Sequence, residues 1–302
     1  MTKETNEERL GTAPLGRLMV SLAVPAVAAQ LINILYNIVD RVYIGHIRDY
    51  GDIALTGVGV TFPIIMLISA FSAFAGMGGA PLASIELGKK DIRKAELILG
   101  NSAGMIVLFS IVLTIGFSIF KRPVLYAFGA SDATIGYAES YVAIYLVGTI
   151  FVQTAIGLNT FISGQGESKI AMLSVVIGAV LNICLDPLLI FVLGMGVRGA
   201  AVATVISQAV SAAWVLRFLT SKRSVMKLKP ANMRLKRDIV KQIASLGISP
   251  FIMQSTESMV SITLNSGLQK YGGDLYVGTM SIMTSIMQLI LIPVQGISQG
   301  VQ

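Results

Sequence analysis

Charged residues are scarce in this chain, at 13% of its 302 residues, whereas soluble domains carry about 25%. Cysteine occurs once, at Cys184, which excludes a disulfide framework. Histidine also occurs once, at His46, so a histidine-rich metal site is not indicated. No Walker lysine motif and no signal-peptide pattern before the first hydrophobic run are present. These absences argue against a soluble enzyme, a secreted disulfide-rich domain and an ATPase.

Long hydrophobic runs, in contrast, are abundant. Hydrophobic residues make up 54% of the chain and its mean hydropathy is +0.75. A helix needs about 20 apolar residues to cross about 30 Å of hydrocarbon. Eight segments reach that length: 15–40, 54–81, 97–120, 138–163, 170–194, 199–220, 243–269 and 275–302. The sequence therefore predicts an all-α membrane protein, a polytopic bundle of about eight transmembrane helices.

Basic residues predict how the bundle is oriented, because cytoplasmic loops retain Lys and Arg. With the N-terminus inside, 17 of the 23 basic residues fall on the inner side. The largest group is the stretch SKRSVMKLKPANMRLKRD at 221–238. We therefore expect a multi-pass plasma-membrane protein with a cytoplasmic N-terminus. A regulated anionic-lipid site in the basic stretch is an alternative reading of the same charge.

A weak internal similarity divides the chain into two parts. SLAVPAVAAQ from Ser21 resembles SLGISPFIMQ from Ser245, at an offset of 224 residues. Such an offset is typical of two parallel six-helix repeats. The predicted parts are a cytoplasmic N-terminus (1–14), an N-lobe (15–220), a basic inter-lobe loop (221–241) and a truncated C-lobe (242–302). We expect a fragment with one complete lobe; a natural eight-helix protein is the alternative.

Two aspartates lie within the hydrophobic runs. A carboxylate at the middle of a membrane-spanning helix costs about 2.5 to 3.5 kcal/mol on insertion scales, so it is retained for function or for pairing. Asp186 lies in LSVVIGAVLNICLDPLLIFVLG, and Asp40 lies near the outer end of the first run. Asn33, Tyr36 and Asp40 follow a spacing of three or four residues, which places them on one helix face.

The polar residues of the fifth and sixth runs extend this pattern. Asn182 and Asp186 are four residues apart, and Pro187 is expected to kink the helix directly after the acid. Thr204 lies near the start of the sixth run, at a similar depth. We expect Asp40, Asn182, Asp186 and Thr204 to meet in the outer half of the first lobe.

The chemistry of such a cluster is cation binding. Two desolvated carboxylates close together cannot both stay ionised at low cost, so they hold a proton or recruit a hard cation. Carboxylate, amide and hydroxyl oxygens suit sodium, for which Asp40, Asn182, Asp186 and Thr204 are the candidate ligands. The alternative is a structural role, in which Asp40 pairs with Arg41 at the level of the lipid headgroups.

Several motifs resemble the N-terminal lobe of bacterial multidrug and toxic compound extrusion (MATE) transporters. They are DRVYIGHI with ALTGVGVTFPI, ISGQGESKIAM (162–172), LNICLDPLLIF (181–191) and GAAVATVISQ (199–208). The resemblance implies twelve helices in two six-helix lobes, of which this chain would contain eight. It also implies an N-lobe cation and drug-linked network. The matching positions are Tyr36, Asp40, Asn159, Asn182, Asp186 and Thr204, with Tyr141 as a further candidate and Asn33 on the same face as Asp40.

Glu257 is the acid within the seventh run. In one branch of the family a glutamate at the matching place contributes to cation coupling in the second lobe. By the internal similarity Glu257 corresponds to Asn33 rather than to Asp40, so the two lobes are expected to differ chemically. Helices outside the chain would supply its partners, so the completeness of this site stays open.

These observations predict a proton- or sodium-coupled antiporter that exports amphipathic, often cationic compounds by alternating access. We expect no catalytic residues, no cofactor, no nucleic-acid partner and a monomeric full-length protein. A lipid-linked oligosaccharide flippase would need a cavity lined with Arg and Lys, which this lobe has little of. An intramembrane aspartyl protease would need Tyr-Asp and Gly-x-Gly-Asp contexts, which neither acid has. A non-transporting fragment is the remaining alternative.

Overall fold

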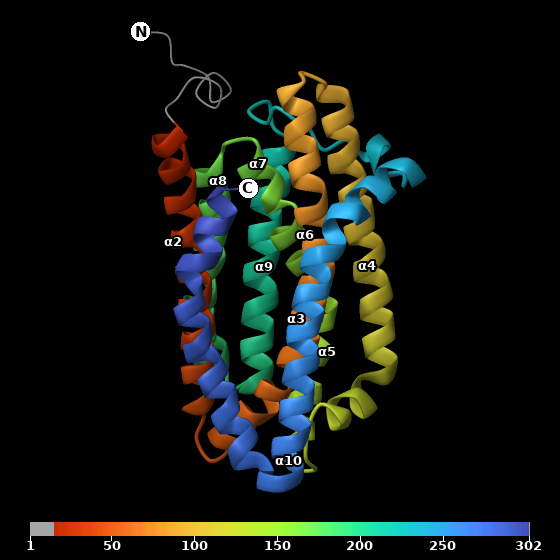
Figure 1. Cartoon of the computed structure of the whole chain (residues 1–302). Helices are drawn as coiled ribbons and strands as arrows, with labels where there is room; N and C mark the ends of the chain where they lie inside the picture. The colour runs from red at the N-terminus through yellow and green to blue at the C-terminus, as the bar shows by residue number, and fades with distance from the viewer. Residues whose placement is uncertain (1–14, 302) are drawn as a thin grey trace.

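The computed structural model describes residues 15–301, with side chains for 23–284, 286 and 287. Every regular element in residues 15–301 is helical (Figure 1). In chain order the elements are α2 (Leu15–Gly45), α3 (Gly51–Gly88), α4 (Ile92–Ala127), α5 (Ile135–Val147), α6 (Thr149–Gly157), α7 (Asn159–Gly164), α8 (Ser168–Pro187), the π-helical turn η1 (Leu188–Val192), α9 (Val197–Thr220), the 3-10 turn η2 (Pro230–Met233) and α10 (Arg237–Val301).

Five helices of the described part are long and apolar enough to cross a membrane. They are Ala23–Gly45, Gly51–Gly88, Ile92–Ala127, Ser168–Val192 and Val197–Thr220. A sixth span is formed if Ile135–Val147 and Thr149–Gly164, which meet at an angle of 61°, count as one. These six match the first six predicted segments. The all-helical membrane fold is therefore confirmed, and the fourth span is bent.

The seventh and eighth predicted segments both lie in α10. Its chain direction reverses at Gly273, whose φ of 71° and ψ of −168° break the helix. Figure 1 shows the two arms, 237–272 and 274–301, diverging from a turn at the end of the bundle opposite the N-terminus, the first along α3 and the second along α2. Neither arm is among the candidate spans of the described residues. Polar residues such as Gln254 and Glu257 interrupt the first arm.

Glycines let α10 pack closely on α3. A Cβ atom on Gly78 would lie 2.5 Å from the carbonyl oxygen of Ile243, and one on Gly247 would lie closer still to that of Phe74. Any larger side chain would separate the two helices, since these neighbours are backbone atoms. Nearer the other end, Ser258 Oγ donates a hydrogen bond to the Pro63 carbonyl at 2.9 Å. The first arm of α10 is thus fixed to α3 at two levels.

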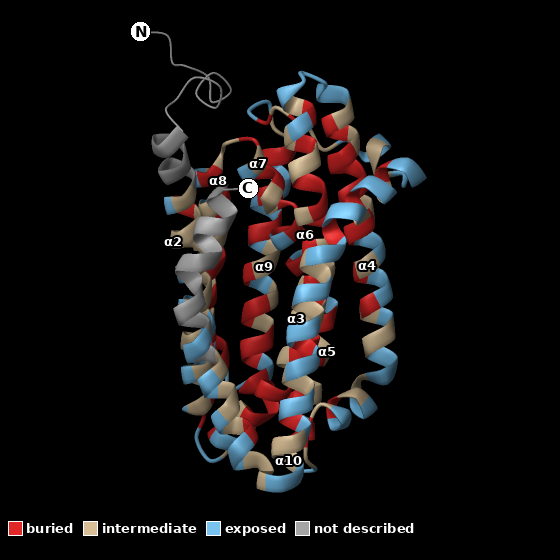
Figure 2. Ribbon diagram, in the orientation of Figure 1, coloured by how far each residue is buried: buried red, intermediate tan, exposed pale blue. Residues whose placement is uncertain are grey.

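The first lobe places its polar helix faces inside. α8 packs between α2 and α9, and α9 packs in turn against α5 and α6. At the bend of the fourth span, a Cβ atom on Gly148 would lie 2.5 Å from Val205 Cγ2, so glycine permits the close approach of α9. Figure 2 shows buried residues concentrated on α3 and α9. The faces of α2, α8 and α9 that carry the candidate residues therefore meet within the lobe.

Residues 221–236, which we call the inner strap, are docked on the first lobe. Gln165 Oε1 accepts hydrogen bonds from Ser224 Oγ at 3.0 Å and from two backbone amides of the strap, at Val225 (2.9 Å) and Met226 (3.3 Å). Asn101 contributes two further bonds: its Oδ1 accepts from the Lys236 amide at 2.7 Å, and its Nδ2 donates to the Asn232 carbonyl at 3.2 Å. The last residues of the predicted loop, 237–241, are the first turn of α10.

Candidate functional site

Asp40 and Asp186 are both buried in the first lobe. Asp40 lies on α2 with 8% of its surface exposed, and Asp186 lies on α8 with none exposed. The two carboxylates are close enough to interact electrostatically. Each has one oxygen, Asp40 Oδ1 and Asp186 Oδ2, that is buried and has no hydrogen-bond partner among the described residues. The structure thus brings the two predicted acids together.

Asn182 completes the core of the cluster. Its Nδ2 donates a hydrogen bond to Asp186 Oδ1 at 3.2 Å, which is the contact expected from a spacing of four residues on one helix. Its own Oδ1 is buried and unpaired within the described part of the chain. Three acceptor oxygens from three side chains are therefore desolvated without a donor. Each such atom costs about 1 to 3 kcal/mol unless a proton or a cation satisfies it.

The helix around Asp186 differs from the predicted kink. Ser168–Val192 is one continuous candidate span, in which α8 ends at Pro187 and the next five residues form the π-helical turn η1. Proline lacks the N–H that an α-helix requires at that place, and a wider turn accommodates the loss. The expected break after the acid is therefore a local change of helix type rather than a bend of the whole span.

Tyr36 and Tyr141 surround the acids. The Tyr36 hydroxyl interacts electrostatically with both Asp40 and Asp186, and Gln208 Nε2 lies 3.4 Å from it, at donor distance. Tyr141 is buried and interacts with Asp40. Two tyrosine side chains from different helices, α2 and α5, therefore border the carboxylates.

Thr204 is connected to the cluster through Tyr141. The Thr204 hydroxyl lies near the Tyr141 hydroxyl, and Thr204 Oγ1 donates a hydrogen bond to the Ala200 carbonyl at 3.0 Å. Gln208, one turn further along α9, was not among the predicted residues. Its place four residues after Thr204 in GAAVATVISQ put it on the same face, which is the signal that could have identified it.

Asn159 lies apart from the acids. It begins α7 and contacts the start of α8: its Nδ2 donates to the Ala171 carbonyl at 3.2 Å, and its Oδ1 accepts from Ser174 Oγ at 3.3 Å. Ser174 precedes Asn182 by eight residues, which is about 12 Å along a helix. The position of Asn159 is therefore that of a link between helices.

Neither Asn33 nor Glu257 forms a hydrogen bond with the two acids in the described part of the chain. The Asn33 carbonyl accepts a hydrogen bond from Asn37 Nδ2 at 2.6 Å, one turn along α2, and Asn37 is exposed. Glu257 is exposed on the first arm of α10, where its neighbour Ser258 turns inward to α3. A role of Glu257 in a second site stays a prediction.

Arg41 is not a simple headgroup-level partner of Asp40. Its guanidinium interacts with the Asp40 carboxylate, and it also donates to the Ser281 carbonyl at 2.6 Å and reaches Ser281 Oγ at 3.3 Å. The same group lies 5.2 Å from the centre of the Phe62 ring. Arg41 therefore connects the buried acid to the second arm of α10, a contact that sequence reasoning did not predict.

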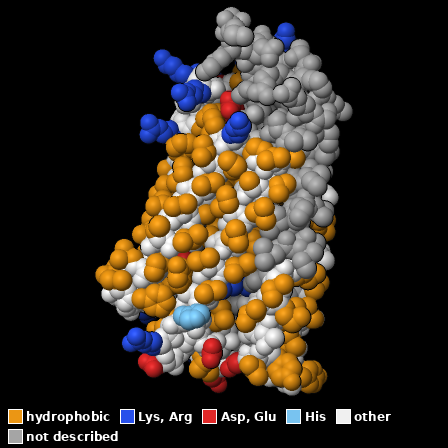
Figure 3. Space-filling model, turned by 90° about the vertical axis from the view of Figure 1, so that its left-hand side faces the viewer, with side chains coloured by type: hydrophobic (Ala, Val, Ile, Leu, Met, Phe, Trp, Pro, Cys, Tyr) orange, Lys and Arg blue, Asp and Glu red, His pale blue; other side chains and the backbone are white. Residues whose placement is uncertain are grey.

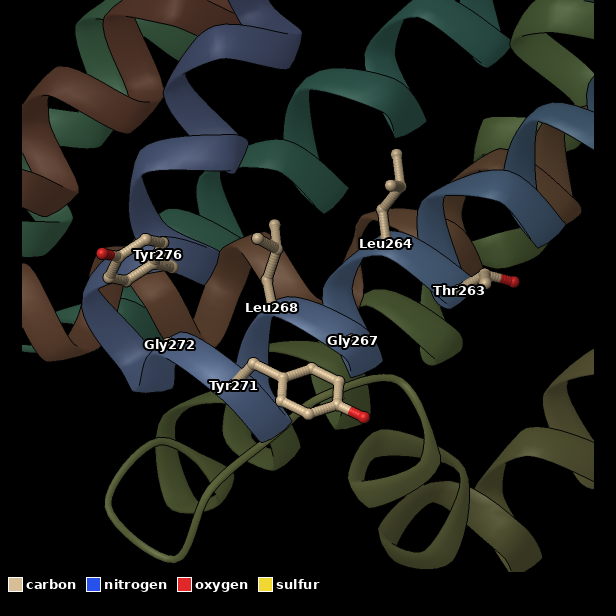
Figure 4. Close-up of a pocket in the computed structure, with 7 residues that line it drawn as sticks. All are labelled: Thr263, Leu264, Gly267, Leu268, Tyr271, Gly272 and Tyr276. Atoms are coloured by element: carbon tan, nitrogen blue, oxygen red, sulfur yellow. The ribbon is translucent and has the colours of Figure 1, made fainter.

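The described residues contain no group of three or more His, Cys, Asp or Glu side chains arranged to hold a metal ion. A hollow of about 360 Å³ lies on α10, lined by Leu264, Leu268, Tyr271 and Tyr276 among others. Figure 4 shows Leu268 between Tyr276 and Leu264, with Tyr271 below it, at the helix reversal. This apolar hollow contains none of the predicted site residues.

Comparisons with known proteins agree with the fold. The MatE family model matches residues 25–188, more than half of the chain. The chain is 25% identical over 285 residues to the multidrug export protein MepA of Staphylococcus haemolyticus, and 24% identical over 290 residues to that of a Staphylococcus aureus strain. It spans 62% and 63% of the length of these two relatives, which cover 94% and 96% of the chain.

Solved structures extend the comparison. A structure of the MATE multidrug transporter DinF-BH matches 99% of this chain with a TM-score of 0.92 and 36% identity. A MOP superfamily transporter from Pyrococcus furiosus matches the same share with a TM-score of 0.86 and 26% identity. In both cases this chain corresponds to 66% of the other chain.

Proposed function

The chain belongs to the MatE family, and from this membership we propose that the whole protein is a cation-coupled exporter of amphipathic, often cationic compounds. The family relatives named above are multidrug export proteins rather than enzymes, which supports export of small molecules across a membrane. The chain spans less than two thirds of their length, so the activity belongs to the whole protein.

The observation that carries the proposal is the set of three buried, unpaired oxygens on Asp40, Asn182 and Asp186. A bound proton would supply a donor to one carboxylate and remove the repulsion between the two acids. A sodium ion would be coordinated by the same carboxylate and amide oxygens, with Thr204 as a further hard ligand. Either cation offsets the cost of burying these atoms within the lobe.

Exchange between cation and substrate follows from charge. With its acids ionised the cluster attracts a cationic compound, and neutralising the acids removes that attraction. Inward movement of one monovalent cation releases about 2.3 kcal/mol per 100 mV of membrane potential, to which a concentration gradient adds. We propose that this energy drives export by alternating access, with Tyr36 and Tyr141 bordering the cation site.

The two-lobe organisation belongs to the same proposal. Residues 15–220 would form one lobe, and the arms of α10 would begin the second. The positive-inside pattern supports a plasma-membrane protein whose inner strap and N-terminus face the cytoplasm. Full-length monomers are proposed because each lobe of one chain provides the surface against which the other moves.

The proposal is tested with Asp186→Asn and Asp40→Asn in the full-length protein. Each change keeps the shape of the side chain and removes the ionisable group, so export of a cationic dye from energised cells should fall to background while membrane insertion stays intact. Asp49→Asn is the matched control, because Asp49 is exposed and has a φ of 71°, which Asn also adopts. Normal drug resistance in cells that express Asp186→Asn would refute a coupling role.

The coupling ion is identified separately. In proteoliposomes of the full-length protein, a pH gradient and a sodium gradient are imposed one at a time, and dye uptake is followed. A proton-coupled transporter responds to the first gradient alone, and a sodium-coupled one to the second alone. No response to either gradient in a protein that binds the dye would contradict cation coupling and favour a different energy source.

A further inference from the structure

A second hollow, of about 490 Å³, lies between the start of α8 and the end of α9. Its lining includes the cationic side chains of Arg217, Lys222 and Arg223, together with Ile170 and Trp214. No acidic residue lines this hollow in the described part of the chain. Neither the cation cluster nor the export proposal uses any of these residues. We call it the basic hollow.

The positive charge of the basic hollow is uncompensated within residues 23–284. None of its three cationic side chains forms an ion pair with a described residue, and all three are exposed. By contrast, Glu86 and Glu96 neutralise other lysines at the same end of the molecule, such as Lys94 and Lys229. An anion is therefore the ligand whose charge complements the hollow, and phosphate is an anion that guanidinium groups bind with two parallel hydrogen bonds.

The apolar wall of the hollow continues along α9. Ile206, Val210 and Trp214 follow at intervals of four residues and are all exposed. They lie on the side of α9 opposite Thr204 and Gln208, which face the interior of the lobe. α10, with which the second lobe would begin, packs on α2, α3 and α4, whereas α9 packs on α5, α6 and α8. The stripe therefore faces away from the second lobe and toward hydrocarbon.

Figure 3 shows the side of the molecule that lies on the left in Figure 1. Hydrophobic side chains form a broad band, and Lys and Arg side chains gather at the upper end, where the inner strap lies. Tryptophan prefers the boundary between hydrocarbon and headgroups. Trp214, with 37% of its surface exposed, stands at that boundary between an apolar stripe and three cations.

The inner strap holds two of the cations in place. Lys222 and Arg223 directly precede Ser224, whose Oγ donates to Gln165 at 3.0 Å and whose neighbours are bonded to the same oxygen. The Arg223 amide is also bonded to Ser221 Oγ at 3.2 Å. Because the backbone is fixed before a ligand arrives, little ordering is needed when one binds.

We propose that the basic hollow binds the headgroup phosphate of an anionic phospholipid, with an acyl chain lying along Trp214, Val210 and Ile206. Basic pockets between transmembrane helices on the cytoplasmic side are suited to this chemistry. The lipid would be drawn from the leaflet at the strap end of the bundle. Its binding does not depend on transport, so the two proposals fail independently.

The test uses Trp214 as its own reporter. Trp214 is the one tryptophan in these 302 residues. In the full-length protein, a Trp214→Phe variant gives the fluorescence of any tryptophans outside these residues, which is subtracted as background. The protein is reconstituted with phosphatidylglycerol or phosphatidylcholine whose acyl chains carry bromine, which quenches a tryptophan that it contacts. We expect the apparent affinity of the site for brominated phosphatidylglycerol, measured by quenching, to be about tenfold higher than that for brominated phosphatidylcholine.

The charge is tested by Arg217→Gln, Lys222→Gln and Arg223→Gln together, which should reduce this preference to near unity. The matched control is the triple variant Arg93→Gln, Arg234→Gln and Lys236→Gln, which neutralises two arginines and one lysine outside the hollow. It should keep the preference for phosphatidylglycerol. A charge-preserving pair, Arg217→Lys with Arg223→Lys, should also retain it.

Four results would overturn the assignment. Equal quenching by both lipids in the native protein would remove the headgroup preference, and an unchanged preference in the neutralised triple variant would place it elsewhere. Absence of quenching by either lipid would mean that protein, not lipid, covers Trp214. Inorganic phosphate and unlabelled phosphatidylglycerol are also added as competitors. If phosphate relieves the quenching as completely as the lipid does, the ligand is a soluble anion instead.

Discussion

Replacing Gln165 with alanine should release the inner strap from the first lobe. One oxygen, Gln165 Oε1, accepts the Ser224 hydroxyl and the amides of Val225 and Met226 at 2.9 to 3.3 Å. Gln165, Ser224 and Met226 are all buried, so the donors that lose this acceptor are not simply transferred to water. Loss of the bonds leaves the Val225 and Met226 amides unsatisfied, while Ser224 Oγ keeps its bond to the Met226 carbonyl. The loss should cost about 2 to 4 kcal/mol of docking free energy.

That cost predicts a measurable change in opening of the strap. At 1.4 kcal/mol per factor of ten, the population of the undocked strap should rise about 30-fold to 700-fold, up to the point at which it is mostly open. The strap carries Lys227, which is followed by Leu228, so tryptic cleavage after Lys227 reports opening of the strap directly. When opening and closing are fast relative to cleavage, the cleavage rate follows this population.

The assay is limited tryptic digestion of detergent-solubilised full-length protein, with cleavage after Lys227 followed by mass spectrometry. Gln242→Ala is the matched control, since Gln242 is a glutamine at the start of α10 whose side chain is exposed. It should leave the rate unchanged. A rate in Gln165→Ala within threefold of the native one would refute the reasoning, because the three hydrogen bonds would then contribute little to docking.

Three further changes test other contacts. Glu96→Gln should raise the same tryptic rate by less than about fivefold, because its partner lysine is 54% exposed and such pairs contribute about 1 kcal/mol or less. Gly78→Ala should lower the melting temperature of the full-length protein, because overpacking costs about 1 to 3 kcal/mol. Gly116→Ala, which has open space around it, should leave the melting temperature unchanged. Equal effects of the two substitutions would contradict the close approach of α3 and α10. Arg41→Gln should speed hydrogen exchange of peptides that cover 275–287, since a charged hydrogen bond to Ser281 contributes about 1.5 to 3 kcal/mol; unchanged exchange would show that this bond does not hold the second arm.

Much of the fold followed from the sequence because the bilayer leaves few choices. Apolar runs of sufficient length must be helices, and the six runs between 15 and 220 correspond to helices or to one bent pair. The neighbourhood of Asn182 and Asp186 was also predictable, since their spacing fixes one shared face. The reversal at Gly273 was anticipated only as a gap between two hydrophobic segments.

Side chains that act between helices were harder to predict. Asn159 carried a family resemblance to a network residue, yet its contacts are with Ala171 and Ser174. Gln208 was not predicted as a site residue, although its side chain reaches the Tyr36 hydroxyl across the lobe. Periodicity orders residues along one helix and around its axis, but it contains no information on where two helices cross.

The sequence by itself determined that this protein is a helical membrane protein with two costly acids, Asp40 and Asp186, on polar helix faces. The physical reason is the bilayer, which penalises every charge and every unpaired backbone group in the same way wherever the helix stands. Only the tertiary structure decided which faces meet, which oxygens stay unpaired, and that Arg41 reaches Ser281 from the side of Asp40. Those outcomes depend on close approaches such as Gly78 against Gly247, where a single added carbon would move a helix.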